Sequence, residues 1–422
     1  MRKKIVTGIL IALLVFCTVI VATMHMKKEA AGPAAAEAVW EPSESRQVML
    51  CMGEKKDTMF ISWRGDKDGP RLLRFSEDKY SLPVTVPVMA EKTKILTGNH
   101  YRYKVRLTDL EAGKTYHYEI GDGVAYDVPR SFSVPDKDSE DVFVYLGDPQ
   151  FDKSVADYEA WGELTRKMYE EHPEVEFAII GGDMVNLPAR KDHWNGFLDN
   201  CDVFSELPVQ TIPGNHEGVT SNNTYKKIFH HLGNGPYGEA FYWFETEQCR
   251  FIMVDSSFLT KARQMTVGKA LWNVHDQEIK AWLKDSLAES SKRWNIVVTH
   301  HPVYGMHDVF TVSKDIREKW LPIIKDGGAD LVLCGHQHVY MRTRPIDGTV
   351  YVMGVSGPKR SNYYTGSNAP VYAEAMYASG PNYQIIRAND DQLEIVSYNE
   401  KGSIIDAARI GDSFKLPYSQ IF

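Results

Sequence analysis

Hydrophobic and polar residues alternate in the first third of the chain, from about residue 47 to residue 135. The alternation is clearest in three short runs, residues 58–63, 101–107 and 116–120, with turn-forming residues between them. A period of two predicts half-buried strands, and several short strands of this kind indicate an all-β sandwich. Within it, we expect Trp63 to fill the core and Tyr116 to bond back to upstream backbone as a tyrosine corner.

From residue 141 onward the pattern changes to continuous apolar runs separated by stretches with helical periodicity. One such stretch runs through residue 170, and another, residues 277–287, places Ile279, Trp282, Leu283 and Leu287 on one face. Continuous apolar runs indicate strands covered on both faces, and their alternation with helices predicts α/β order. The predicted strands are residues 142–146, 177–180, 249–254, 295–298 and 331–333, and the tail from residue 383 to 410 returns to a strand pattern.

The N-terminus carries a long uncharged segment, residues 5–22, directly after Arg2, Lys3 and Lys4. As a helix it would nearly span a bilayer core of about 30 Å. We favour an uncleaved signal anchor over residues 1–26, with its N-terminus inside, followed by a linker over residues 27–45. The alternative is a cleaved secretory signal with its site in the alanine-rich run 30–38. Either interpretation predicts a location at the cell membrane or outside it.

Composition places the chain among globular proteins, because 43% of its 422 residues are hydrophobic and 25% are charged. The length allows two or more domains. The net charge of −8 provides no basic footprint for duplex nucleic acid, so that class of partner is not expected.

The five cysteines form no regular framework. Cys17 lies in the proposed anchor, behind Phe16, which argues against lipid attachment there. The sequence allows one disulfide without fixing a pairing among the other four, Cys51, Cys201, Cys249 and Cys334.

Polar residues gather where the apolar runs of the second region end. Taken singly, each cluster has an ordinary explanation as a turn, a helix cap or a hydrogen-bonded histidine. Five clusters in succession at strand ends, where such sheets bind ligands, indicate a metal site instead. They are Gly147-Asp148-Pro149-Gln150, Gly181-Gly182-Asp183-Met184-Val185-Asn186, Gly214-Asn215-His216-Glu217, His300-His301-Pro302 and Gly335-His336-Gln337-His338.

This series resembles the motifs of the calcineurin-like metallophosphoesterases, Asp-x-His, Gly-Asp, Gly-Asn-His-Glu/Asp, His and Gly-His-x-His, and four of the five match in full. The chain is most similar to the purple acid phosphatases, which also begin with a fibronectin type III-like domain. The flanking residues 251–255, 298–304 and 335–342 add to the resemblance, which covers about residues 47–406. It implies a fibronectin type III-like sandwich over residues 46–136. Over residues 137–422 it implies an α/β metallophosphoesterase domain with two mixed sheets flanked by helices.

The resemblance also implies two divalent metal ions that activate a hydroxide to attack a phosphate ester. Asp183 would bridge the ions. His216 would donate a hydrogen bond or proton to the phosphoryl or leaving oxygen, and Glu217 would orient His216. The donor set suits manganese, iron or zinc without ranking them. The remaining ligands would be Asp148 and His338 on the first ion and Asn215, His300 and His336 on the second.

Two positions depart from the family pattern near the first ion. Gln150 stands where most relatives carry His and purple phosphatases carry Gly, and we expect its amide oxygen to bind metal. Asn186 stands where purple phosphatases carry Tyr, whereas Tyr158, the nearest phenol after the first motif, is expected to pack on its helix. His307 is a candidate substrate contact, with a structural role as the alternative, and His301 is expected to support the strand end.

The sequence therefore favours an exported, membrane-tethered enzyme that hydrolyses small phosphate esters. The rival interpretation is a degenerate, non-catalytic envelope protein that uses the fold for binding, and Gln150 motivates it. Six retained ligand positions and His216 argue against that rival. Monoesterase, phosphodiesterase and nucleotidase activities stay open because residues 221–238 show no clear pocket signal, and no protein partner is predicted.

Overall fold

The computed structural model describes residues 45–65, 69–95, 98–137, 140–218, 223–229, 232–238, 240–307, 311–360 and 368–411. These residues belong to one compact unit. The predicted anchor, residues 1–26, and all but the end of the predicted linker lie outside the described residues. Within the described ranges, no helix has the length and hydrophobicity needed to cross a bilayer.

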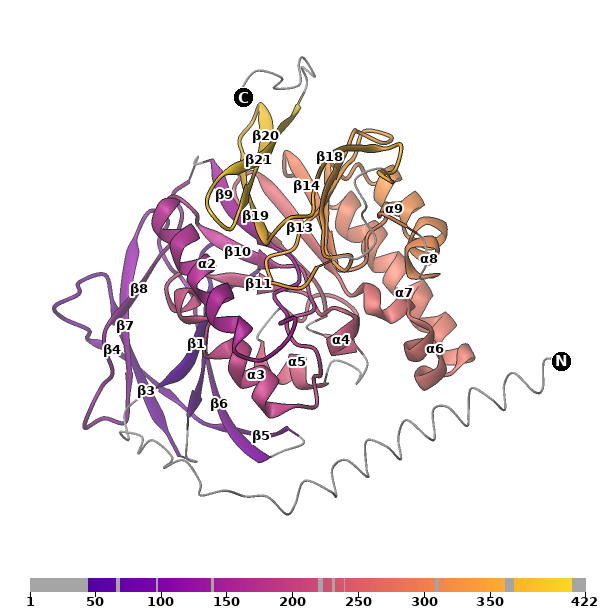
Figure 1. The fold of residues 1–422 in the computed structure, drawn as a ribbon. Coiled ribbons are helices and arrows are strands. Elements are labelled where there is room, and N and C mark those ends of the chain that lie inside the picture. Colours follow the sequence, from indigo (N-terminus) through magenta and orange to yellow (C-terminus); the bar gives the residue numbers. More distant parts are fainter. Residues whose placement is uncertain are drawn as a thin grey trace. The chain divides into compact units, whose positions relative to one another are not determined.

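The N-terminal part is a sandwich of two four-stranded antiparallel sheets (Figure 1). One sheet has the order β1 (Arg46–Met52), β2 (Met59–Gly65), β6 (Gly98–Leu107) and β5 (Glu91–Ile95). The other has the order β4 (Val84–Val88), β3 (Arg71–Ser76), β7 (Thr115–Gly121) and β8 (Arg130–Ser133). The alternating pattern of the sequence thus corresponds to strands that share a single core.

Two aromatic residues of the sandwich behave as the sequence predicts. Trp63 is fully buried and stacks on Tyr103, with ring centroids 5.3 Å apart. The Glu111 amide donates to the Tyr116 hydroxyl at 2.9 Å, which is the expected tyrosine corner. Both aromatic residues therefore support the fold.

The second part contains two larger mixed sheets. The six-stranded sheet has the order β11 (Val209–Thr211), β10 (Phe177–Ile180), β9 (Asp141–Leu146), β19 (Asn382–Ala388), β20 (Gln392–Asn399) and β21 (Ile404–Gly411). The seven-stranded sheet has the order β12 (Phe241–Glu245), β13 (Cys249–Val254), β14 (Trp294–Thr299), β15 (Leu331–Cys334), β17 (Val350–Met353), β16 (Tyr340–Thr343) and β18 (Ala373–Tyr377). Strands β9 to β11 run parallel, as do β13, β14, β15 and β17. Phe143, Phe177 and Phe251 pack together where the sheets face each other.

Helices cover the outer faces of this sheet pair (Figure 1). Trp161 of α2 and Phe197 of α3 pack with Ile180 of the six-stranded sheet, and Leu283 of α7 packs with Val297 of the other. The helices are α2 (Asp157–Glu171), α3 (Lys191–Leu198), α4 (Asn215–Gly218), α5 (Asn223–Ile228), α6 (Lys261–Val267), α7 (Lys269–Ala288), α8 (Thr311–Lys319) and α9 (Leu321–Asp326), with 3-10 turns η1 (Asp202–Ser205) and η2 (Ser256–Leu259). The predicted fold class, a β-sandwich followed by two mixed sheets flanked by helices, is confirmed.

Buried contacts join the sandwich to the second part. Gln210 Nε2 donates to the Met52 carbonyl at 2.9 Å, and the Tyr118 hydroxyl donates to the Ser205 carbonyl at 2.6 Å. Met49 of β1 belongs to the same hydrophobic core as Val144 of β9. The sandwich and the larger sheets are therefore joined by both polar and apolar contacts.

The four cysteines of the described chain, Cys51, Cys201, Cys249 and Cys334, are all buried, and none forms a disulfide. The one disulfide that the sequence allowed is therefore absent from the described residues, and Cys334 is a buried thiol. Burial raises the pKa of the Cys201 and Cys249 thiols well above the ordinary value, so both stay protonated.

Candidate metal centre

The site is built from five loops that follow β9, β10, β11, β14 and β15. Backbone hydrogen bonds join the loops to one another. The backbone N–H of Gln150 donates to the Asp183 carbonyl at 3.1 Å, and the backbone N–H of Gly335 donates to the His300 carbonyl at 3.0 Å. The five clusters that the sequence placed at strand ends therefore meet at one position in the fold.

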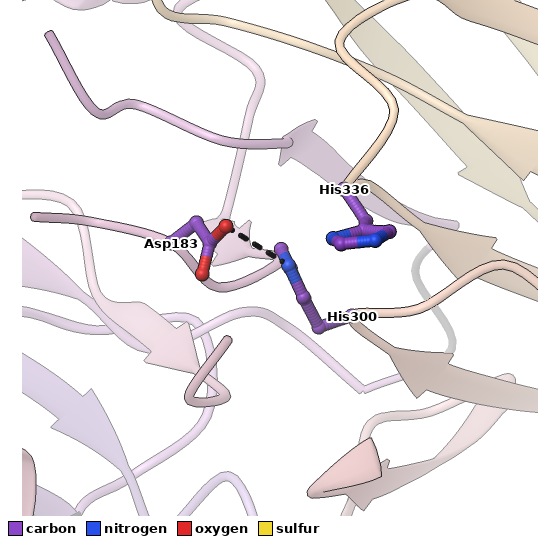
Figure 2. A group of neighbouring side chains, drawn as sticks. All are labelled: Asp183, His300 and His336. Atoms are coloured by element: carbon purple, nitrogen blue, oxygen red, sulfur yellow. Dashed lines mark ion pairs between the residues drawn. The ribbon is translucent and has the colours of Figure 1, made fainter. Parts of the chain in front are cut away.

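Two sets of potential metal ligands share one carboxylate. Asp183, His300 and His336 form the first set (Figure 2), and Asp148, Asp183 and His338 form the second. Within each set, one nitrogen or oxygen atom per residue lies within 4.8 Å of the corresponding atoms of the others. A carboxylate common to two adjacent ligand sets is the arrangement that a pair of bridged ions requires.

Two amide side chains complete the cluster. Asn215 Oδ1 lies 3.2 Å from His300 Nε2. Gln150 Nε2 lies 3.3 Å from Asp183 Oδ2 and 3.1 Å from His338 Nε2. All seven residues predicted as metal ligands are therefore neighbours. Gln150, however, presents its amide nitrogen to Asp183 and His338, whereas we expected its oxygen to bind metal.

The backbone holds several of these side chains in a conformation that non-glycine residues rarely adopt. Asp148, Asp183, His336 and His338 all have positive φ values, of 40°, 52°, 74° and 51°. Such left-handed residues cost free energy and persist where surrounding contacts enforce them, commonly at functional sites. Glycine makes the close approach feasible at Gly214, where an added Cβ would overlap Asp183 Oδ1.

The donor set fits metal ions chemically. Asp148 Oδ1 is buried without a hydrogen-bond partner among the described residues, and an orphaned carboxylate oxygen of this kind is a natural cation ligand. Burial, together with nearby positive charge, lowers the pKa of His336 and His338 to about 3. Both rings are therefore neutral near pH 7, which is the form that binds metal.

The remaining ligands Asp148, Asp183 and His300 shift one another's pKa values. Burial raises the pKa of Asp148 to about 8, although the positive charges of His300 and Lys359 oppose the shift. Burial alone would lower the pKa of His300, but Asp183, 3.1 Å away, raises it to about 10. The same pairing outweighs burial at Asp183 and holds its pKa well below the usual range. The His300 imidazolium thus partly neutralises the carboxylate that belongs to both ligand sets.

His216 and Glu217 lie beside the cluster but have different surroundings. The His216 side chain is 29% exposed, with Nε2 3.8 Å from Asp183 Oδ2. Its Nδ1 lies 2.7 Å from the Asn186 carbonyl, which sets the ring orientation. Glu217 is fully buried and accepts hydrogen bonds from the backbone amides of Asp183, Val185 and Gly214 at 2.8–3.0 Å.

The sequence predicts that Glu217 orients His216, but the contacts of Glu217 are with other groups. Its carboxylate joins the loop of Asp183 to the loop of Asn215, whereas the Asn186 backbone holds the His216 ring. Burial, then the charge of Asp183, raises the pKa of Glu217 to about 7. Glu217 is thus a positioning residue for the ligand loops.

The other residues singled out from sequence have distinct positions. Asn186 Nδ2 donates to the Phe151 carbonyl at 2.7 Å, and the Tyr158 hydroxyl donates to the Met184 carbonyl at 2.6 Å, so Tyr158 packs on its helix as expected. His301 is buried, with Nδ1 2.9 Å from Ser256 Oγ, and supports the strand end. The His307 carbonyl accepts from Gln337 at 3.0 Å, while the substrate contact proposed for its ring stays a prediction.

Sequence reasoning missed Lys359. Its Nζ donates to Gln150 Oε1 at 3.3 Å, which places an ammonium group at the edge of the ligand cluster. A single lysine in a loop carries no sequence signal of such a position. The five metal-ligand motifs do not include this segment.

Comparison with known proteins agrees with this geometry. The calcineurin-like phosphoesterase family model matches residues 117–340, more than half of the chain, and the purple acid phosphatase N-terminal domain matches residues 45–134. An uncharacterized protein of Mycobacterium tuberculosis is 25% identical over 206 residues, which are 41% of this chain and 36% of that protein. The chain therefore spans little more than a third of that relative's length.

Two further relatives cover more of the chain. The Fe(3+)-Zn(2+) purple acid phosphatase 12 of Arabidopsis thaliana is 23% identical over 363 residues, covering 78% of this chain and 71% of that protein. The structure of purple acid phosphatase PPD1 from yellow lupin seeds shares the fold, with a TM-score of 0.69 and 14% identity over 88% of this chain and 75% of that one. The chain belongs to the calcineurin-like phosphoesterase family and begins, in its described part, with a domain of the purple acid phosphatase N-terminal type.

Proposed function

We propose that the protein hydrolyses phosphate esters with two metal ions held by the described cluster. The observation that carries this proposal is Asp183, which belongs to both ligand sets. Asp148 and His338 would hold one ion, beside the Gln150 amide, and Asn215, His300 and His336 the other. When bound, the ions would supply Lewis acidity at the phosphoryl oxygens and lower the pKa of an attacking water.

The chain's own groups have complementary roles in this proposal. His216 stands at the cluster with a partly exposed ring fixed by the Asn186 carbonyl, so its Nε2 is placed to donate to a phosphoryl or leaving-group oxygen. Glu217 keeps the ligand loops together, which preserves the spacing of the two sets. Precise positioning of this kind is a main source of rate acceleration in enzymes.

A panel of substrates separates this proposal from a non-catalytic binding role. The purified protein is loaded in turn with manganese, zinc or iron and offered a phosphate monoester, a diester and a nucleotide. Turnover with any ester, lost on chelation and restored by metal, supports hydrolysis. Bound metal without turnover of any ester would favour the binding protein instead.

The metal identity leads to a testable prediction about colour. Purple phosphatases owe their colour to a tyrosinate on ferric iron, but this chain has Asn186 at that position, and its amide is bonded to the Phe151 carbonyl. Tyr158 donates to the Met184 carbonyl and is fully buried. We therefore expect a colourless protein that works with divalent ions, although one relative is named as an Fe(3+)-Zn(2+) enzyme.

The check is a visible spectrum of metal-replete protein beside its metal analysis. Tyr158→Phe serves as the matched control, because it removes the first phenol that follows the Asp148 motif in the sequence and keeps the ring. An intense visible band that disappears on reduction of bound iron would contradict the prediction. Loss of such a band in the Tyr158 variant would identify the ligand.

We further propose that residues 1–26 anchor the protein in the cytoplasmic membrane with the catalytic part outside. The uncharged stretch 5–22 behind three basic residues supports this proposal. Activity is expected in the membrane fraction. Protease added to intact cells without a wall should release a soluble active fragment that begins near residues 30–38. Activity confined to the cytosol would refute the anchor.

A further inference from the structure

The geometry points to Lys359 as a phosphate-binding residue that favours phosphoryl groups carrying two negative charges, the terminal phosphates of monoesters. This inference rests on the proposed phosphoesterase function and adds to it a residue outside the metal-ligand motifs. Lys359 Nζ lies 3.3 Å from Gln150 Oε1, while Nε2 of the same amide lies 3.3 Å from Asp183 Oδ2. One amide group therefore separates the ammonium from the shared carboxylate.

The segment that carries Lys359 is held firmly against the first ligand loop. The Ser356 hydroxyl donates to the Gly147 carbonyl at 2.7 Å, and the Gly357 amide donates to the Asp148 carbonyl at 3.1 Å. Trp161 Nε1 donates to Ser356 Oγ at 3.0 Å, which fixes the same turn from α2. These bonds lie two and three residues before Lys359, so its backbone position is set by the loop that supplies Asp148.

Close packing at Gly357 strengthens this placement. A Cβ at that position would lie 2.5 Å from the Asp148 carbonyl oxygen and 2.8 Å from the Gln150 carbonyl oxygen. Arg360 Nη1 donates back to the Gly357 carbonyl at 3.1 Å. Only glycine permits this close approach of the two loops, which places Lys359 beside Gln150.

The surroundings of Lys359 explain why its charge is available to a ligand. The side chain is partly exposed, and its ammonium donates to the neutral Gln150 amide. A charged ammonium beside a neutral amide at the edge of a ligand cluster is suited to an incoming anion. Two ions can each bind one phosphoryl oxygen, and Lys359 would bind a third.

A monoester phosphoryl group has three terminal oxygens and two negative charges, whereas a diester has two such oxygens and one charge. The third oxygen is the group that Lys359 would recognise, so removing the ammonium should affect monoesters far more than diesters. Hydrogen bonds to charged groups contribute enough free energy to predict a loss of about 10- to 100-fold.

The test uses the full-length protein loaded with metal and compares Lys359→Met with Lys359→Arg. The readouts are kcat/KM for p-nitrophenyl phosphate and for bis(p-nitrophenyl) phosphate, and the affinity for inorganic phosphate by calorimetry. Lys401→Met, on the exposed turn between β20 and β21, is the matched control. Metal content is measured for every variant.

Lys359→Met should lose about 10- to 100-fold in monoester kcat/KM and in phosphate affinity, with diester kcat/KM changed by less than about threefold. Lys359→Arg should recover most of the loss, and Lys401→Met should match the parent protein. Unchanged phosphate affinity in Lys359→Met, or an equal loss on both esters, would overturn the inference. A parent protein that turns over no ester defeats the proposed function instead, and phosphate affinity still decides the role of Lys359.

Discussion

Replacing Asp183 with asparagine is expected to remove both metal ions and nearly all activity. Asp183 is the one residue common to the two ligand sets, and its carboxylate lies 3.1 Å from His300. An amide has no negative charge to share between two cations, so neither ion would keep its full ligand set. Since loss of a single electrostatic donor in an enzyme can cost about 10²–10³-fold, we expect Asp183→Asn to lose at least about 10³-fold in kcat.

The measurement pairs metal analysis with turnover on the same samples. Asp202→Asn is the matched control, because Asp202 is an exposed aspartate in η1 that pairs with Arg166. The control should keep two ions and parental activity. Asp183→Asn protein that retains two tightly bound ions, or that turns over normally, would show that the carboxylate does not bridge the pair.

The overall architecture was accessible from sequence because its signals are local. Continuous apolar runs correspond to β9, β10, β13, β14 and β15, and the alternating runs correspond to β2, β6 and β7. The metal-ligand residues could be predicted from the sequence for a related reason. Parallel strands of one sheet bring their carboxyl ends to one edge, so Asp148 can be grouped with Asp183, and His300 with His336, without knowledge of distances.

The supporting contacts were not accessible because they depend on groups distant in sequence or on backbone atoms. The hydrogen bond from Lys359 to Gln150 spans 209 positions. The Asn186 carbonyl that holds His216 belongs to the main chain, whose contacts no motif reveals. Glu217 belongs to a motif, but the sequence does not show that its partners are the amides of Asp183, Val185 and Gly214.

The junction between the sandwich and the larger sheets illustrates the same point. Asp141 is fully buried at the start of β9 and accepts from the Glu247, Gln248 and Cys249 amides, while Lys56 of the sandwich lies 3.3 Å away. The sequence places Asp141 only at a boundary between two patterns. Burial of a carboxylate is tolerated there because several amides and one ammonium compensate its charge.

The second large effect is expected at His216, for which we propose a chemical role. The His216 backbone amide, which donates to Asp183 Oδ1 at 2.9 Å, is retained in any substitution, and the ring belongs to neither ligand set. His216→Ala should therefore keep both ions. Loss of a positioned acid typically lowers the rate by about 10²–10⁴-fold, and we expect kcat to fall within that range.

Substrates with different leaving groups distinguish the two possible actions of the His216 ring, which are to protonate the leaving oxygen or to bind the phosphoryl oxygens. If Nε2 protonates the departing oxygen, His216→Ala should slow an alkyl phosphate far more than p-nitrophenyl phosphate, because the nitrophenolate leaves without a proton. If the ring binds only the phosphoryl oxygens, both substrates should slow equally. His117→Ala, on β7 of the sandwich, is the control and should change neither rate. Parental activity in His216→Ala, with two ions bound, would remove the ring from the mechanism and leave the metal cluster alone to account for turnover.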